Sequence, residues 1–204
     1  MADVALRPAR RLPLPGEAAP ARALPGDLAI WLFIFAELLV FGVLFAAYAV
    51  ARRAHVEAFD ASQALLDRRL GLLNTMLLIS SSFAVARAVQ AVRADRARAC
   101  AHWLFGAVLL GCVFLLIKGM EFRRDADAGM TLSSGLFEMF YLCLGLFHFL
   151  HVVMGLVILA VVAWKSLHGH YDGRSHAGVE TGASYWHMVD LVWILLFMLV
   201  YVLH

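Results

Sequence analysis

The sequence DLAIWLFIFAELLVFGVLFAAYAVA, residues 27–51, decides the fold of this chain. Between Leu28 and Ala51 it carries one charged side chain, Glu37, and at about 1.5 Å per residue this run would form a helix about 36 Å long. That length exceeds the roughly 30 Å hydrocarbon core of a bilayer. A central carboxylate costs roughly 2.5 to 3.5 kcal/mol on insertion scales, whereas each Leu, Ile, Phe or Val contributes about 0.3 to 0.6 kcal/mol in favour of insertion. We therefore predict a transmembrane helix with an ionisable group near the bilayer midplane.

The composition extends this interpretation to the whole chain. Of its 204 residues, 63% are hydrophobic and only 16% are charged, and the mean hydropathy is +0.79. Soluble domains are nearer half apolar and a quarter charged, so the chain is an integral membrane protein. Most of its arginines fall in short segments between apolar runs, which argues against the basic face of a nucleic-acid-binding protein.

The apolar runs predict an all-α membrane protein with one domain, residues 27–204, and five transmembrane helices. Before this domain, residues 1–26 hold all five prolines among many Arg and Ala residues, and we expect a flexible tail there. Asp60-Ala-Ser-Gln63 resembles a capping box and predicts a short helix before the second membrane crossing. The predicted transmembrane helices are about 28–51, 70–92, 101–122, 135–164 and 184–203.

The distribution of basic residues predicts the orientation. Five crossings place the two termini on opposite sides of the membrane, and Lys and Arg outside the helices are more numerous on the side of the N-terminus. The positive-inside rule then predicts a cytoplasmic N-terminus and an external C-terminus. On that topology Lys118 and Glu121 lie toward the outer face, and His187 and Asp190 toward the cytoplasmic face.

Glu37 is the first candidate site residue. It could be a proton-exchanging carboxylate, a ligand, or a buried anchor bonded to a neighbouring helix. Because a low dielectric disfavours the charged form of a carboxyl group, we expect Glu37 to be protonated and hydrogen bonded between helices. The measurement that tests this is a difference infrared spectrum in which the carboxyl band is lost on Glu37→Gln.

His148 and His151 lie three residues apart in the run 135–164, on one helix face. Such a pair could ligate a metal or haem, but a metal site wants a third ligand and membrane haem sites usually draw one His from each of two helices. Gly145 and Gly155 share that face, and small residues allow close helix approach. We therefore expect the histidines to form hydrogen bonds between helices and to bind no metal.

Further polar residues fall inside or beside the predicted helices. Lys118 and Glu121, three residues apart, can pair on one face, and Asn74 lies on a polar face that seeks another helix. The first turn of helix 184–203 holds further candidates, His187 and Asp190, which could orient a ligand, hold a lipid headgroup or cap the helix, with Trp186 in the interfacial aromatic belt. The sequence contains no nucleophile–base triad and no phosphate-binding glycine loop, so we assign no catalytic residue.

Taken together, these residues give residues 27–204 a resemblance to subunit III of the haem-copper oxidase superfamily. Each motif is modest by itself, but one falls in each predicted helix and all five follow the order of the family. The motifs are Trp31…Ala36-Glu37, Leu73-Asn74-Thr75, Lys118-Gly-Met-Glu121-Phe122, Phe147-His148-Phe149-Leu150-His151…Gly155 and Tyr185-Trp186-His187-Met188-Val189-Asp190.

The resemblance implies an accessory subunit without haem or copper of its own, packed against a haem-containing catalytic subunit I. It also implies two groups of helices around a V-shaped cleft that holds phospholipid. Glu37 matches the carbodiimide-reactive glutamate of the family, which has been linked to proton uptake or to structural support. A five-helix chain corresponds to the shorter bacterial version, which resides in the cytoplasmic membrane.

Within the superfamily the chain looks most like the NorE-type branch, which is associated with nitric oxide reductase and denitrification. The short length, the segment Phe59-Asp60-Ala61-Ser62-Gln63, and Lys118 in place of the Gln often found in oxidase subunits indicate this branch. Phe122 and Phe149 depart from the Tyr and Gly that are common at their positions.

The function expected from the resemblance is assembly, stabilisation and lipid organisation around nitric oxide reductase. The alternative is subunit III of an aerobic cytochrome c or quinol oxidase. A small proton-coupled transporter using Glu37, Lys118 and the two histidines of helix 135–164 belongs to another class. Transporter sites often use broken helices and paired repeats, and no proline interrupts any predicted helix here. An independent haem-binding electron carrier would need suitably placed histidines on two helices.

Overall fold

The computed structural model describes residues 28–203, and the predicted tail at 1–26 lies outside them. This part of the chain is helical and contains five helices long and apolar enough to cross a membrane, as the sequence predicts. In chain order the elements are α1 (Leu28–Ala54), α2 (Val56–Gln63), α3 (Arg68–Arg93), α4 (Ala97–Asp127), α5 (Leu136–Leu167), α6 (Ala177–Phe197) and the π-helical turn η1 (Met198–Val202).

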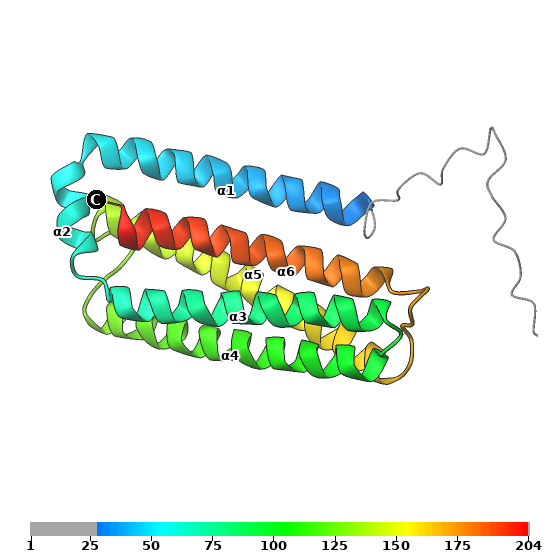
Figure 1. Ribbon diagram of the computed structural model, residues 1–204. Coiled ribbons are helices and arrows are strands. Elements are labelled where there is room, and N and C mark those ends of the chain that lie inside the picture. The colour runs from blue at the N-terminus through cyan, green and yellow to red at the C-terminus, as the bar shows by residue number, and fades with distance from the viewer. Residues whose placement is uncertain (1–27, 204) are drawn as a thin grey trace, which may run out of the picture.

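Helices α3 to α6 form an antiparallel bundle, and α1 runs along its side against α5 and α6 (Figure 1). Short connections at 94–96, 128–135 and 168–176 join successive bundle helices. Helix α2 lies at the same end of the bundle as the C-terminus (Figure 1). We call this the α2 end.

Helix α1 is only lightly buried. Its buried residues are Ile34, Phe41 and Tyr48, one every seven residues, so a single narrow seam of the helix faces the bundle. Leu39, 69% exposed, lies on the outward face. In a bilayer this outward surface would face lipid, which explains why α1 is apolar on nearly all sides.

Helices α4 and α6 extend furthest beyond their predicted ranges, and the early start of α6 moves two candidate residues. Helix α4 continues to Asp127, and α6 begins at Ala177 rather than near Ser184. The early start of α6 is stabilised by Glu180, whose Oε1 accepts hydrogen bonds from Nε and Nη2 of Arg93 on α3 at 3.0 and 2.7 Å. A glutamate in the first turn is also favoured by the helix dipole. The expectation that His187 and Asp190 occupy a first turn was therefore wrong.

The segment 60–63 was expected to start a helix, but it ends α2 instead. Within α2, Asp60 forms an ion pair with Arg52 of α1 at 2.9 Å. The N-cap of the next helix is Asp67, whose Oδ1 accepts the backbone N–H groups of Arg69 and Leu70. The short helix before the second crossing is present as α2, but the capping-box prediction was wrong because α2 already begins at Val56 and Asp60 lies inside it.

Gln63 is a buried polar anchor at the α2 end. Its Nε2 donates to the hydroxyl of Tyr48 at 3.1 Å and to the carbonyl of Val200 at 2.9 Å. These contacts join α2 to both α1 and η1. A helix of only 8 residues such as α2 gains its position from these tertiary bonds rather than from helix propensity.

Trp186 is fully buried, at 0% exposure, so its expected place in an interfacial aromatic belt was wrong. Its indole lies against Gly111 of α4 and Gly155 of α5: an added Cβ would come within 3.0 and 2.8 Å of the ring. The predicted role of Gly155 in close helix approach is confirmed. The two glycines create the space that a tryptophan fills.

Candidate functional site

The helix bundle encloses several groups of polar side chains at membrane depth. One of them joins α1 to α5: Glu37 Oε2 lies 3.0 Å from His151 Nε2. Glu37 and His151 are 19% and 8% exposed in their side chains. The rings of Phe41 and Phe147 pack against the imidazole at centroid distances of 5.3 and 4.7 Å.

The hydrogen bonds of His151 limit where protons sit. Its Nδ1 lies 2.7 Å from the backbone carbonyl of Phe147, which can only accept, so Nδ1 carries a proton. The contact between Nε2 and Glu37 then contains one further proton, held either by a neutral carboxyl or by an imidazolium. The pair is electrically neutral in both arrangements, which suits a low-dielectric setting. The location of that proton on Glu37 stays a prediction.

A second polar group is centred on Lys118, which is 1% exposed. Its Nζ donates to Glu121 Oε2 at 3.0 Å and to the hydroxyl oxygens of Tyr141 and Tyr201 at 3.1 and 2.8 Å. These bonds use all three ammonium protons. The predicted Lys118–Glu121 pair is confirmed, and it forms a cluster with two tyrosines from α5 and η1.

The carboxylate oxygens of Glu121 also have hydrogen-bond partners in this cluster. Glu121 Oε1 accepts from the Tyr201 hydroxyl at 2.8 Å, and it lies 3.1 Å from the Tyr141 hydroxyl. Tyr141 also lies 2.9 Å from Asp125 Oδ2, so its one proton is shared between two carboxylates. A buried ion pair persists only when such additional hydrogen bonds compensate for desolvation.

Aromatic rings complete the surroundings of the lysine. Its Nζ lies 4.8 Å from the ring centroids of Phe122 and Tyr141, and 5.5 to 5.9 Å from those of Tyr201 and Trp193. A cation at these distances is attracted by the negative ring faces. Phe122, which departs from the family pattern, therefore packs against the Lys118 ammonium group.

His148 has a different environment from His151, although both lie on α5. It is buried between the rings of Phe114 and Trp193, at centroid distances of 6.0 and 5.2 Å. Neither of its ring nitrogens has a hydrogen-bond partner in the described part of the chain. The expected bond from His148 to another helix is thus not present. That the two histidines bind no metal stays a prediction.

Asn74 and Thr75 lie at the α3 side of the bundle. The Trp193 indole N–H donates to Thr75 Oγ1 at 3.0 Å, which joins α6 to α3. Asn74 is fully buried, and its amide has no hydrogen-bond partner within residues 28–203. The predicted helix-seeking face of this segment is therefore buried as expected, although its bonds run through Thr75 and Ser81 rather than Asn74.

His187 and Asp190 face α3 rather than a loop. His187 is exposed and its Nδ1 lies 2.6 Å from Ser82 Oγ, while Asp190 is 8% exposed. His187 lies at one edge of a hollow of about 290 Å³ between α3 and α6, which also includes Gln90. The two residues therefore form no Asp–His pair in this structure, and each lies beside α3.

Tyr201 and Gln63 were not candidates from the sequence. Tyr201 is 80 residues from Glu121 and Gln63 is 137 residues from Val200. No local spacing marks such pairs. The one signal available in the sequence was a tyrosine near the end of the last apolar run, because a tyrosine hydroxyl that becomes buried needs a partner.

Together the fold and these contacts define a multi-pass helical membrane protein in which Glu37, Lys118 and Glu121 are bonded within the bundle. The chain belongs to the cytochrome c oxidase subunit III family, which its residues 21–204 match. It is 36% identical to cytochrome c oxidase subunit 3 of Thermostichus vulcanus over 178 residues, 86% of both chains. It is also 36% identical to the Synechocystis protein of the same name, over 93% of this chain and 81% of that one.

These comparisons confirm the superfamily but not the branch. The relatives found are named cytochrome c oxidase subunit 3, and nothing in them supports the NorE-type branch or a link to nitric oxide reductase and denitrification. They favour the aerobic oxidase that the sequence left as the alternative. The short length and Lys118 were therefore weak indicators of branch.

Proposed function

We propose that this chain is the non-catalytic subunit III of an aerobic haem-copper oxidase in a bacterial cytoplasmic membrane. It packs against the catalytic subunit I, supports its assembly and stability, and organises phospholipid around it. The observation that carries the proposal is the family match along the whole membrane domain, with relatives named as subunits of cytochrome c oxidase. Haem and copper belong to the partner.

The use of the polar groups supports an accessory role. The Lys118 donors and both Glu121 oxygens are satisfied by each other and by tyrosine hydroxyls from α5 and η1, so the cluster links three elements of the bundle. A catalytic constellation instead needs a group directed at a site where a reacting atom can sit. The Glu37–His151 contact fits the same role, because it is a polar bond in the otherwise narrow seam of α1.

The test is purification of the tagged full chain from native membranes in mild detergent. We expect it to copurify with a copper-containing oxidase, identified by mass spectrometry and by a haem reduced-minus-oxidised spectrum. The haem should leave with the partner when the subunits are separated. Recovery with nitric oxide reductase subunits would contradict the aerobic assignment, and a chain that came out alone with its own haem or with ion transport would contradict the accessory role.

The orientation has its own measurement. The proposal places the N-terminus in the cytoplasm and the α2 end outside. Single-cysteine variants at exposed Ser133, in the connection at the α2 end, and at Arg174, in the connection at the opposite end, can be labelled with an impermeant maleimide in intact spheroplasts. Both should be made in a background without Cys112 and Cys143, which are exposed. We expect labelling at position 133 and not at 174. The opposite pattern would contradict the proposed orientation.

A further inference from the structure

Helices α3 and α6 run side by side in the bundle (Figure 1), and His187 of α6 is exposed at the surface that they share. His187 lies ten residues from either end of α6, which spans Ala177–Phe197. Its neighbour on α3 is Ser82, in a helix that spans Arg68–Arg93. At about 1.5 Å per residue, Ser82 is about 21 Å from the first residue of α3 and about 16 Å from the last. His187 therefore reaches the surface near the middle of the membrane.

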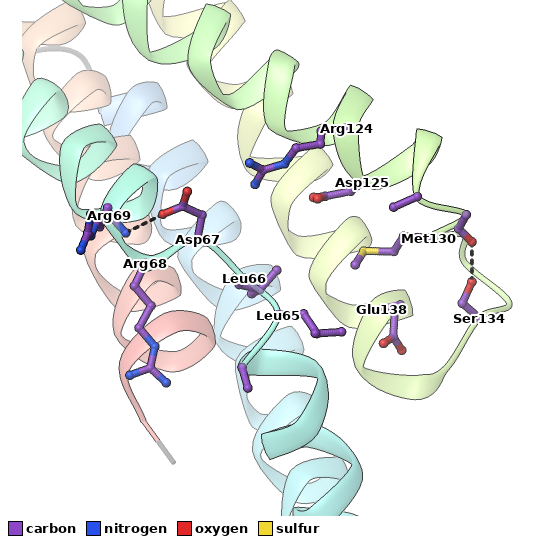
Figure 2. A pocket seen from close by; sticks show the side chains of 13 residues that line it. Leu65, Leu66, Asp67, Arg68, Arg69, Arg124, Asp125, Met130, Ser134 and Glu138 are labelled. Atoms are coloured by element: carbon purple, nitrogen blue, oxygen red, sulfur yellow. Dashed lines mark hydrogen bonds between the residues drawn. The ribbon is translucent and has the colours of Figure 1, made fainter.

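This depth is exceptional among the exposed His, Lys, Arg, Asp and Glu residues of the five long helices that the structure describes. Each of the others lies within six residues of a helix end. Figure 2 shows examples at a hollow of about 1080 Å³ at the α2 end, where Arg69 lies in the first turn of α3 and Arg124 near the end of α4. Ionisable residues deep in a bilayer almost always face protein or a water-filled cavity. The surface around His187 is therefore not suited to lipid.

The imidazole of His187 has hydrogen-bonding capacity to spare. Its Nδ1 lies 2.6 Å from Ser82 Oγ, and within residues 28–203 the ring makes no other hydrogen bond or ion pair. Hydrocarbon cannot satisfy the remaining nitrogen, Nε2. A polar side chain on a neighbouring transmembrane helix can, and such bonds hold helices together in membranes.

The surface beside His187 is also hollowed. The hollow of about 290 Å³ between the two helices is lined by small residues from both, Ala86 on α3 and Ala183 and Ser184 on α6. Interfaces between transmembrane helices are enriched in small residues, because these let another helix come close. The hollow can therefore admit a side chain from a helix that packs against α3 and α6.

The outward faces of α1 and α5 have the opposite character. Leu39 of α1 is 69% exposed, and Leu150 and Val157 of α5 are 57% and 59% exposed. Large apolar side chains of this kind are favourable in hydrocarbon. The combination of an ionisable group at mid-membrane depth with a hollow lined by small residues thus distinguishes the α3–α6 surface from these two faces.

We propose that the catalytic subunit I packs against the α3–α6 surface around His187. One of its transmembrane helices presents a hydrogen-bonding side chain to His187 Nε2 and places a second side chain in the hollow. This inference rests on the proposed function, since membership of the cytochrome c oxidase subunit III family supplies the partner. The apolar outward faces of α1 and α5 are left to lipid.

The test is photocrosslinking in native membranes, with benzoylphenylalanine at one outward-facing position of the full chain. Leu191 of α6, 48% exposed, lies one turn from His187 on the proposed surface. The matched control is Leu150 of α5. The contact between Gly155 and Trp186 aligns the antiparallel α5 and α6, which puts positions 150 and 191 at the same depth. We expect a crosslink to the catalytic subunit, identified by mass spectrometry, from position 191 and none from position 150.

The outcomes separate this surface from the proposed function. A crosslink to the catalytic subunit from position 150 and not from 191 would overturn the surface and leave the accessory role intact. A crosslink from position 191 to a second copy of this chain, or to no protein, would overturn it as well. If the catalytic subunit is absent from the preparation, the proposed function fails, and this inference fails with it.

The contribution of His187 is measured by titrating the detergent-solubilised chain with the catalytic subunit. His187→Leu should raise the dissociation constant about 3- to 30-fold, the range of hydrogen bonds between transmembrane helices. His187→Gln keeps a hydrogen-bonding group and should raise it less. The matched control is His102→Leu, at an exposed histidine near the start of α4, which should leave the constant unchanged. Equal effects of His187→Leu and His102→Leu, or no effect of His187→Leu, would overturn the bond to the partner.

Discussion

Replacing Lys118 by methionine removes the centre of the buried cluster while keeping the length of the side chain. The change deletes three hydrogen bonds and leaves the Glu121 carboxylate buried with only tyrosine hydroxyls as donors. Breaking a buried pair by removing one partner costs about 3 to 5 kcal/mol, and we expect the free energy of unfolding to fall by that amount. The assay is unfolding of the purified full chain by SDS in mixed micelles, followed by tryptophan fluorescence.

The double variant Lys118→Met/Glu121→Leu sharpens this test. With both charges gone, the remaining cost is that of the Tyr201 hydroxyl, which loses both of its partners, at about 1 to 3 kcal/mol. The double variant should therefore be more stable than Lys118→Met alone. The matched control is Lys165→Met, at an exposed lysine in the last turn of α5, which should change stability by less than about 0.5 kcal/mol. A Lys118→Met variant within 1 kcal/mol of the parent, or a double variant no more stable than Lys118→Met alone, would refute the reasoning.

Two further predictions concern the helix contacts. Glu37→Gln keeps a donor for His151 Nε2 and should change the free energy of unfolding little. Glu37→Leu removes the bond and should cost about 1 to 3 kcal/mol in the same SDS assay. Equal effects of the two variants would mean that the bond contributes nothing to stability. Gly155→Ala places a methyl group 2.8 Å from the Trp186 ring and should cost about 1 to 3 kcal/mol. Gly119→Ala, where nothing lies within 4 Å of the new methyl group, should be neutral or slightly stabilising, and a loss there equal to that at Gly155 would remove the packing argument.

The sequence predicted those features that depend on short spacings. Five apolar runs of bilayer length gave five helices, because membrane insertion depends on local hydropathy. The Lys118–Glu121 pair was predictable since residues three apart share a helix face. Glu37 was recognised as a group that needs a partner, because a lone carboxylate in a bilayer is costly.

What could not be predicted depends on how helices pack. His148 and His151 lie on one helix face, yet one faces Phe114 and Trp193 and the other faces Glu37. Which of them would meet the carboxylate depends on the position of α1 against α5, and no spacing in the sequence encodes that. The residue at which a transmembrane helix ends could not be predicted either, because a helix can continue past the bilayer wherever interfacial contacts support it.

The narrow seam of α1 also bears on the order of assembly. Helices α3 to α6 pack extensively on one another, whereas α1 contributes only Ile34, Phe41 and Tyr48 to the buried core, besides its bond through Glu37. The helix that leaves the ribosome first among the five therefore has little to hold it until α5 and α6 exist. We expect α1 to insert into the membrane first and to pack against the bundle last, after α3 to α6 have assembled. The same helix would also be the first to separate under mild denaturation, because the least buried unit opens at the lowest free energy.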